Sequence, residues 1–406
     1  MKSKKQAFSG IHVVEFTGFA AGPVVGKHMA DHGAEVVRVE SATRPDGFRT
    51  HYPPFKDDIP GLNRSGCYAI FNDSKCSMTL NLRHPKGIEL AKRMVAWADV
   101  VIENFTPGTM KKLGLDYDTL CQVQPDIIML STCNQGQTGP HASHPGFGSH
   151  LSSLSGFTNL IGYPDRPPAI LYGPYIDFIG GGFGMIAVAA ALDYRRRTGK
   201  GTFIDLAQYE AGVHFIAPLL LDYALNGRVV QRQGNRSPSV APHGAYPCQG
   251  EDRWCTISVH DDEEWTHLKA VLGTPPWANG RFDTLLGRKA HEEELDRHLA
   301  EWTASRTPEE VMGRLQAAGV HAAVVNNMGD LFSDAQLEHR CTWWELEHPE
   351  MGHHHYEIAP FNLSETPAEI NRPAPCLGEH NDYVYREILG LSQEECQSLA
   401  EEEVIK

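Results

Sequence analysis

The stretch LYGPYIDFIGGGFGMIAVAAA, residues 171–191, contains a single carboxylate, Asp177, between an apolar aromatic run and three consecutive glycines. A charged group in such surroundings costs free energy unless it is paired, solvated or used in chemistry. A carboxylate can act as a nucleophile, and it can also cap the helix that the alanine-rich pattern predicts. Considered alone, Asp177 fits the cap better, so the rest of the sequence must decide.

The three glycines Gly180, Gly181 and Gly182 are expected to open a long helix over about residues 181–195. Residues without side chains let a substrate approach the backbone closely, so their N–H groups could stabilise an oxyanion in a dry site. The glycines could equally serve tight packing of the helix start against a sheet. The sequence leaves both interpretations open.

The elements that must position Asp177 are predicted by an alternation of strands and helices through about residue 135. The apolar run 11–16, the helical pattern 24–33 and the strand pattern 35–40 form a βαβ unit, which predicts a parallel sheet. Ligands of open α/β sheets bind beyond the carboxyl ends of the strands. The loops after 11–16, 35–40 and 99–105 therefore form the expected site.

The chain of 406 residues is long enough for two domains. Its character changes between about residues 226 and 325, where short strands and a Trp-rich acidic helical segment replace the earlier alternation. We therefore expect an α/β fold with a large Rossmann-like domain in residues 1–225, a smaller inserted α+β domain in 226–325 and a C-terminal return to the large domain in 326–406.

Composition narrows the classes of function. A formal net charge of −15 argues against a broad nucleic-acid interface, and the turn FTGFAAGP is neither GxGxxG nor a Walker motif. We expect no membrane segment, because no signal-peptide pattern follows the N-terminus and no stretch is expected to reach the roughly 20 apolar residues of a spanning helix. Nine cysteines without CxxC pairs fit a reduced, cytoplasmic protein.

Several blocks, spread in order over nearly the whole chain, resemble the family III CoA-transferases, also named CaiB/BaiF, which include formyl-CoA transferase and carnitine CoA-transferase. These blocks are AAGPVVGKHMADHGAEVVRVE, LNLRHPKGIELAKRMVAWADVVIENFTPGTMKKLGLDY, GQTGP, IDFIGGG, TGKGTFIDLAQYE and LGEHND. The resemblance implies that CoA moves from an acyl-CoA to a carboxylic acid, with Asp177 as the nucleophile. It also implies that CoA is a substrate and that no cofactor is bound permanently.

The resemblance further implies which residues contact CoA. Positions that hold the nucleotide and pantetheine portions in the family, or meet a phosphate, correspond to Phe19, Ala20, Ala21, Asn104, Phe105 and Lys112. Lys75, in NDSKCS, is an additional candidate, because a point charge suits a phosphate.

The chain also departs from formyl-CoA transferase. Ser41 replaces an arginine, with Arg44 a possible substitute, and Cys133, Asn134 and Gln135 replace a Lys-Gly-Tyr triplet. The tetraglycine loop of that enzyme is absent. These departures argue against oxalate or formyl specificity and leave the donor and acceptor acids open, with a dicarboxylate such as succinate as the family default for the donated or accepted acyl group.

Two alternatives come from the same resemblance. The family is similar to α-methylacyl-CoA racemases, which pair the aspartate with a histidine, but Phe147 stands where that histidine would be, with His144 and His150 nearby. The chain could also be a non-catalytic subunit. Family members form interlocked dimers, so a homodimer, or a heteromer with a homologous subunit, is expected.

The segment HPEMGHHHYE contains His348, His353, His354 and His355. Adjacent histidines on a strand point to alternate faces, so one metal ion cannot easily bind all of them. We expect a surface hairpin here and assign no metal site.

Overall fold

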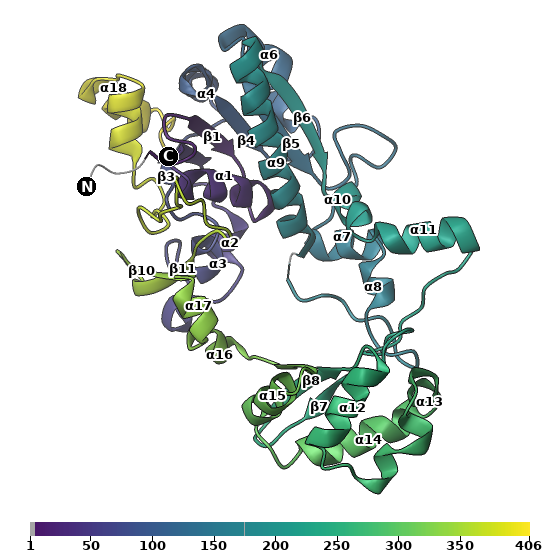
Figure 1. The fold of residues 1–406 in the computed structure, drawn as a ribbon. Coiled ribbons are helices and arrows are strands. Elements are labelled where there is room, and N and C mark those ends of the chain that lie inside the picture. The colour runs from purple at the N-terminus through teal and green to yellow at the C-terminus, as the bar shows by residue number, and fades with distance from the viewer. Residues whose placement is uncertain (1–4, 174) are drawn as a thin grey trace. The chain divides into compact units, whose positions relative to one another are not determined.

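The computed structural model of the protein describes residues 5–173 and 175–406 (Figure 1). The chain forms two compact units. The first contains the described residues through Thr158, together with Ile170–Arg228 and Gln336–Lys406, and the second contains Asn159–Ala169 and Val229–Ala335. The second unit thus extends beyond the expected boundary at 325 and includes a segment that the sequence pattern assigned to the large domain.

The first unit is built on a six-stranded parallel sheet with the order β3-β2-β1-β4-β5-β6. Its strands are rich in Val and Ile, which suit a sheet that is buried on both faces. The strands are β1 (His12–Phe16), β2 (Glu35–Glu40), β3 (Cys76–Thr79), β4 (Val100–Glu103), β5 (Ile128–Cys133) and β6 (Thr202–Ala207). The α/β fold with a parallel sheet is therefore confirmed.

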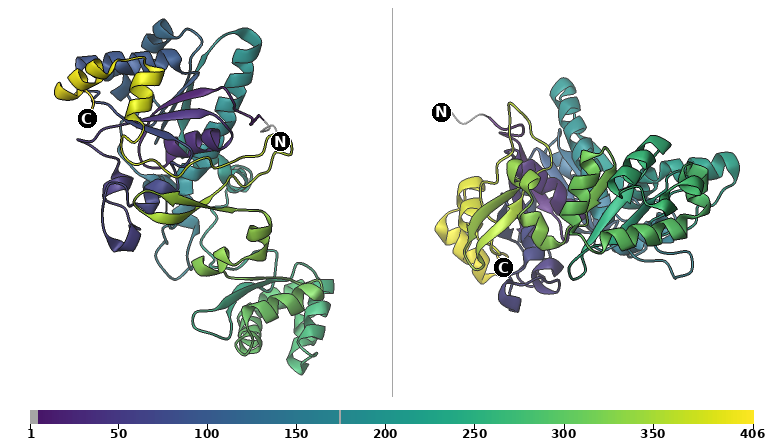
Figure 2. Two further views of the ribbon diagram at one scale, coloured as in Figure 1. Left: turned by 90° about the vertical axis from the view of Figure 1, so that its left-hand side faces the viewer. Right: turned by 60° about the horizontal axis from the view of Figure 1, so that its bottom comes forward.

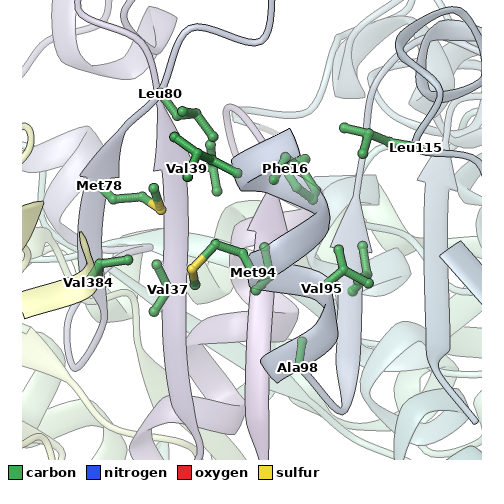
Figure 3. Packing of buried hydrophobic residues seen from close by; sticks show 14 of the residues in the cluster. Phe16, Val37, Val39, Met78, Leu80, Met94, Val95, Ala98, Leu115 and Val384 are labelled. Atoms are coloured by element: carbon green, nitrogen blue, oxygen red, sulfur yellow. The ribbon is translucent and has the colours of Figure 1, made fainter. Parts of the chain in front are cut away.

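Alternate residues of the strands feed two separate cores, one on each face of the sheet. On one face, Val13 packs with residues of α1 (Ala21–Asp31) and α9 (Tyr175–Thr198). On the other face, Val14 packs with residues of α4 (Pro85–Trp97) and α6 (Tyr117–Val123). Figure 3 shows this second core, where Met94 and Val95 of α4, and Ala98 directly after the helix, lie over the strands.

The C-terminal return closes the second core. Val384 and Tyr385, in the π-helical turn Tyr383–Ile388, join the cluster under α4, and the Tyr385 hydroxyl donates a hydrogen bond of 2.6 Å to the carbonyl of Thr79. Figure 2 shows this yellow segment beside α4. The remaining elements here are α2 (Gly47–Thr50), α3 (Gly66–Ala69), α5 (Thr109–Leu113), α7 (Gly148–Leu154), α10 (Gln208–Phe215), α11 (Ala217–Asn226), β10 (Trp343–His348), β11 (Gly352–Glu357) and α18 (Gln393–Glu401).

The second unit has a three-stranded antiparallel sheet with the order β7-β8-β9. Trp265, Phe282 and Leu299 are fully buried in its core. The elements are β7 (His243–Pro247), β8 (Trp254–Ser258), β9 (His321–Val324), α12 (Asp262–Val271), α13 (Leu285–Ala290), α14 (Glu292–Thr303), α15 (Pro308–Ala317) and α16 (Met328–Phe332), while α8 (Phe157–Leu160) and α17 (Ala335–His339) span the boundaries of the two units.

Helix α9 differs from expectation in two ways. It begins at Tyr175, before the glycines, so Gly180, Gly181 and Gly182 lie inside the helix and do not open it. By length and composition it is also apolar enough to cross a membrane, which the sequence analysis did not expect of any segment. In this fold α9 packs on the sheet, where Val188 and Ala191 are buried.

Candidate active site at the carboxyl edge of the sheet

The starts of α1 and α9 lie together at the carboxyl edge of the sheet. Both helices run against the parallel strands, since α1 connects β1 to β2 and α9 leads into β6. A methyl group built on Gly181 would lie 2.6 Å from Val24 Cγ1 and 3.8 Å from the carbonyl oxygen of Ala21. Asp177 is one turn before Gly181 on the same side of α9, so it faces the start of α1.

The carboxylate of Asp177 stands without a partner. Among the residues that the structure describes, none makes a hydrogen bond or ion pair with it, and the residue is half-buried. Burial alone raises the pKa of the Asp177 carboxyl to about 7. A carboxyl group with a raised pKa at the carboxyl edge of a sheet is a candidate for chemistry, because a purely structural carboxylate would normally be paired.

The turn after β1 is held in shape by side chains from neighbouring strands. The side-chain amide of Asn104, which follows β4, accepts a hydrogen bond of 2.8 Å from Gly18 N–H and donates one of 2.7 Å to Gly18 C=O. Asp46 accepts a hydrogen bond of 3.0 Å from Phe19 N–H, and Phe19 adopts a φ of 57°. This turn is therefore a fixed backbone surface beside the start of α1.

A chain of aromatic rings connects this turn to α9. The ring of Phe19 packs edge-on against Phe48 at 5.3 Å, Phe48 stacks on Phe71 at 5.5 Å, and Phe71 contacts Phe178 at 5.5 Å between centroids. Phe178 directly follows Asp177 and is 46% exposed. An apolar wall thus runs from the turn to the candidate nucleophile.

Most residues that the sequence analysis assigned to CoA lie around this edge. Phe19, Ala20 and Ala21 form the turn and the start of α1, and Asn104 braces it. Phe105 N–H donates a hydrogen bond of 2.8 Å to Glu103 Oε2, and its ring packs on the core beneath α4.

The structure bears on two further predictions, the oxyanion role of the three glycines and the phosphate contact of Lys75. The N–H groups of Gly180, Gly181 and Gly182 lie beyond the first turn of α9, so they belong to its hydrogen-bond ladder and cannot serve as oxyanion donors. Gly181 instead allows close packing on α1, as the contact with Val24 shows.

Lys75 is enclosed. It is fully buried, and its ammonium group contacts both oxygens of Glu15, at 3.1 and 3.0 Å, and the carbonyl of Pro23 at 2.8 Å. These partners occupy the donors that a phosphate would need. Lys75 therefore offers no free donor for the predicted phosphate contact, whereas Lys112 is exposed on α5.

Comparison with known proteins identifies the family of the chain. The family model described as CoA-transferase family III matches residues 8–381. The succinyl-CoA:D-citramalate CoA-transferase of Chloroflexus aurantiacus is 32% identical over 97% of this chain and 97% of that protein. The β subunit of the succinyl-CoA:L-malate CoA-transferase of the same organism is 32% identical over 98% of both chains.

A solved structure leads to the same family. The crystal structure of a CaiB/BaiF family protein from Brucella suis is 32% identical, with a TM-score of 0.87 over 95% of this chain and all of that one. The chain belongs to the family III CoA-transferases. As a family III CoA-transferase, this protein is an enzyme that uses CoA thioesters as substrates.

The sequence analysis of this CoA-transferase missed several residues at the edge. Apart from Phe19, the rings of the aromatic chain were not singled out, since they come from separate loops. Gln208, directly after β6, was also missed, although its position beyond a strand end could have identified it. Gln208 Oε1 is buried without a hydrogen-bond partner in the described part of the chain.

The histidine-rich segment forms the predicted hairpin of β10 and β11, and Tyr356 of this hairpin packs in the same apolar cluster as Phe48 and Phe71. His353 contacts Glu345 and Glu347 across the hairpin, at 3.6 and 3.0 Å. Within residues 5–173 and 175–406, no group of three or more His, Cys, Asp and Glu side chains could hold a metal ion.

Proposed function

We propose that this enzyme transfers CoA from succinyl-CoA to a carboxylic acid through covalent intermediates on Asp177. The observation that carries the proposal is the unpartnered carboxylate of Asp177 at the start of α9, beside the turn after β1. A carboxylate that is neither paired nor fully solvated costs free energy in the resting protein. A role as nucleophile explains why this cost is tolerated. A role as helix cap does not explain it, because a capping residue precedes the helix whereas Asp177 lies inside the first turn of α9.

One carboxylate is sufficient for the reaction. An oxygen of Asp177 attacks the thioester carbonyl carbon, and the C–S bond breaks, which gives a mixed anhydride and CoA thiolate. The thiolate then attacks the γ-carbon of Asp177, the donor acid leaves, and an aspartyl-CoA thioester remains. An acceptor carboxylate attacks this thioester, and the same two steps run in reverse on the new acyl group. No general base is needed, because a carboxylate nucleophile carries no proton.

The environment of Asp177 supports this chemistry. Its raised pKa of about 7 reflects weak solvation, and a poorly solvated carboxylate is a better nucleophile than one in water. The apolar wall that ends at Phe178 limits the access of water on that side. Exclusion of water protects both an anhydride and a thioester from hydrolysis.

The CoA portion would lie along the turn after β1. Phe19 offers its half-buried ring as a surface for pantetheine, whereas Ala20 is fully buried, and Lys112 offers an exposed cation for a phosphate. Asn104 would act through the shape of the turn, since both ends of its amide are engaged by Gly18.

Succinyl-CoA is proposed as the donor because two relatives are named for it. The acceptor would be a small carboxylic acid. Cys133 and Asn134, which replace part of the formyl-CoA transferase triplet, lie at the end of β5, and Asn134 is held by Gly146 and Tyr209. This rigid, uncharged strand end favours an acid other than oxalate.

We also propose that the enzyme works as a dimer, with itself or with a homologous subunit. Helix α11 has no buried residue, and Leu221, Tyr223 and Leu225 are 60%, 59% and 80% exposed. Apolar surface of this extent usually marks an interface. The name of one relative as a β subunit supports the heteromeric form equally. Nine free cysteines support a reducing, cytoplasmic setting.

Racemisation is the weaker alternative. It requires an acid and a base on opposite faces of the α-carbon. Phe147 occupies the position of the racemase histidine, and the ring of His150 accepts a hydrogen bond of 3.2 Å from Phe147 N–H as part of a helix cap. Neither arrangement provides a second proton donor for Asp177.

A labelled acceptor tests the proposed mechanism. With succinyl-CoA and an acceptor acid whose carboxylate oxygens are a heavy isotope, one heavy oxygen should appear in the peptide containing Asp177, because the anhydride delivers it there. Product formation without label in that peptide would contradict the covalent route. Asp177→Asn, which should form no product, is the matched control.

A further inference from the structure

Gln208 is the first residue of α10 and one of the most buried polar side chains near the site. It is 5% exposed, and its side-chain oxygen has no hydrogen-bond partner among the described residues. A buried amide oxygen without a partner costs free energy, so its retention calls for an explanation.

Helix α10 crosses the first turns of α9. A methyl group built on Gly212 would lie 2.8 Å from Ile176 Cδ1, and one built on Gly180 would lie 3.2 Å from Gln208 Cγ. Ile176 therefore packs against Gly212, and Gly180, one turn later on α9, packs against Gln208. Gly180 leaves the space that the Gln208 side chain fills.

Gly180 lies three residues after Asp177 on α9, so the Gln208 side chain packs on the face of α9 next to the turn that carries Asp177. Side chains on a helix lean toward its N-terminus, so the space over Gly180 covers the turn that contains Ile176 and Asp177. Gln208 Cγ occupies that space. A half-turn of the amide exchanges its oxygen and nitrogen, so the group can present N–H donors to a neighbouring oxygen.

We propose that Gln208 is a further catalytic residue of the transfer, which donates a hydrogen bond to the oxygen that becomes negative on the γ-carbon of Asp177. This inference rests on the proposed function of Asp177. Each time CoA thiolate or an acid carboxylate adds to that carbon, its carbonyl oxygen becomes an oxyanion, and the oxyanion reverts to a carbonyl when the leaving group departs. No proton is transferred to or from Gln208 in these steps.

The oxyanion at Asp177 needs a hydrogen-bond donor that the glycines of α9 do not supply. The N–H groups of Gly180 and Gly181 are engaged within α9, so they cannot stabilise the oxyanion. The Gln208 side chain is fixed by burial, and its oxygen has no hydrogen-bond partner in the described part of the chain. A half-turn of the amide would put an N–H donor at that position, where no other group competes for it.

The test measures how fast the Asp177 peptide is modified by succinyl-CoA in a single turnover of the full-length enzyme. Gln208→Met, which keeps the volume and loses the donor, should slow the modification by about 10²–10³-fold and leave the dissociation constant of CoA unchanged. Gln397→Met, on the exposed face of α18, is the matched control and should keep the wild-type rate.

Gln208→Glu, which is nearly isosteric, supplies the deciding comparison if the methionine variant melts at a lower temperature. Its carboxylate should repel the oxyanion when ionised and donate when protonated, so its rate relative to wild type should rise as the pH falls. Wild-type rates in both Gln208 variants would overturn the inference and leave the function of Asp177 intact. Absence of any Asp177 adduct in the wild-type enzyme would overturn the proposed function itself.

Discussion

Two neighbouring regions of the first unit treat buried charge in opposite ways. Beneath the turn after β1, every buried cation has a carboxylate: Lys75 pairs with Glu15 at 3.0 Å, and Lys27 pairs with Asp73 at 2.7 Å. At the start of α9, Asp177 has no cation among the described residues. Both regions belong to the first unit, but the ion pairs are fully buried whereas Asp177 is half-buried.

Charged side chains that stabilise the fold differ here from a charged side chain that is available for chemistry. The ion pairs connect segments that are distant in sequence, since Glu15 lies on β1 and Lys75 precedes β3, and they satisfy each other. Removal of one partner would leave the other buried and unpaired. Asp177 holds nothing in place, so its removal should affect the reaction and spare the fold.

The largest effect is expected for Asp177→Asn. Loss of the nucleophile should lower kcat by about 10⁴-fold or more, while the melting temperature stays equal or rises because an unpaired buried carboxylate disappears. Steady-state transfer assays and thermal unfolding check the two halves of this prediction. A large loss of both stability and activity would show that Asp177 stabilises the fold, as the buried ion pairs do.

Lys75→Met should give the opposite pattern. Breaking a buried ion pair costs about 3–5 kcal/mol of unfolding free energy, because Glu15 is left without its partner. Denaturant unfolding measures the loss. The double variant Lys75→Met with Glu15→Gln should recover part of it, and failure to recover would show that the pair does not act as a unit.

Gly181→Ala tests the packing of α9 on α1. Its methyl group would meet Val24 Cγ1 at 2.6 Å, so overpacking should cost about 1–3 kcal/mol. Gly182→Ala is the matched control, because nothing lies within 4 Å of its methyl group and alanine favours a helix by about 0.5–1 kcal/mol. Equal effects of the two substitutions on thermal unfolding would contradict the packing of α9 on α1.

The last effect depends on pH. Because the pKa of Asp177 is raised from 3.8 to about 7, kcat/KM should fall about tenfold per unit of pH below 7. The folded state binds this proton more tightly than the unfolded state, so the stability of wild type relative to Asp177→Asn should decrease as the pH rises from 3.8 to about 7. Rates and melting temperatures at several pH values measure both. A flat difference in stability would contradict the raised pKa.

The sheet could be predicted from the sequence because its strands are short β-branched runs separated by helical patterns, as in residues 11–40. The start of α9 was misplaced, because glycine usually marks a helix end, whereas Gly181 here permits contact with Val24. Local patterns do not contain such contacts between helices that are distant in sequence.

The site was predictable to the extent that it follows motif positions. Asp177 and the turn at Phe19 lie at the same edge, as the order of strand ends implied. The burial of Lys75 was not predictable, because its partner Glu15 is 60 residues away in sequence. The role of Asn104 as a brace of the turn depends likewise on a contact with Gly18 across 86 residues.

The central claim is that Asp177 carries the acyl group and then CoA. The most direct measurement is peptide mapping by mass spectrometry after incubation with succinyl-CoA and trapping with hydroxylamine or borohydride. The account predicts a modification confined to Asp177 and absent from Asp177→Asn. A modification on another residue, or none under conditions in which CoA transfer proceeds, would contradict it.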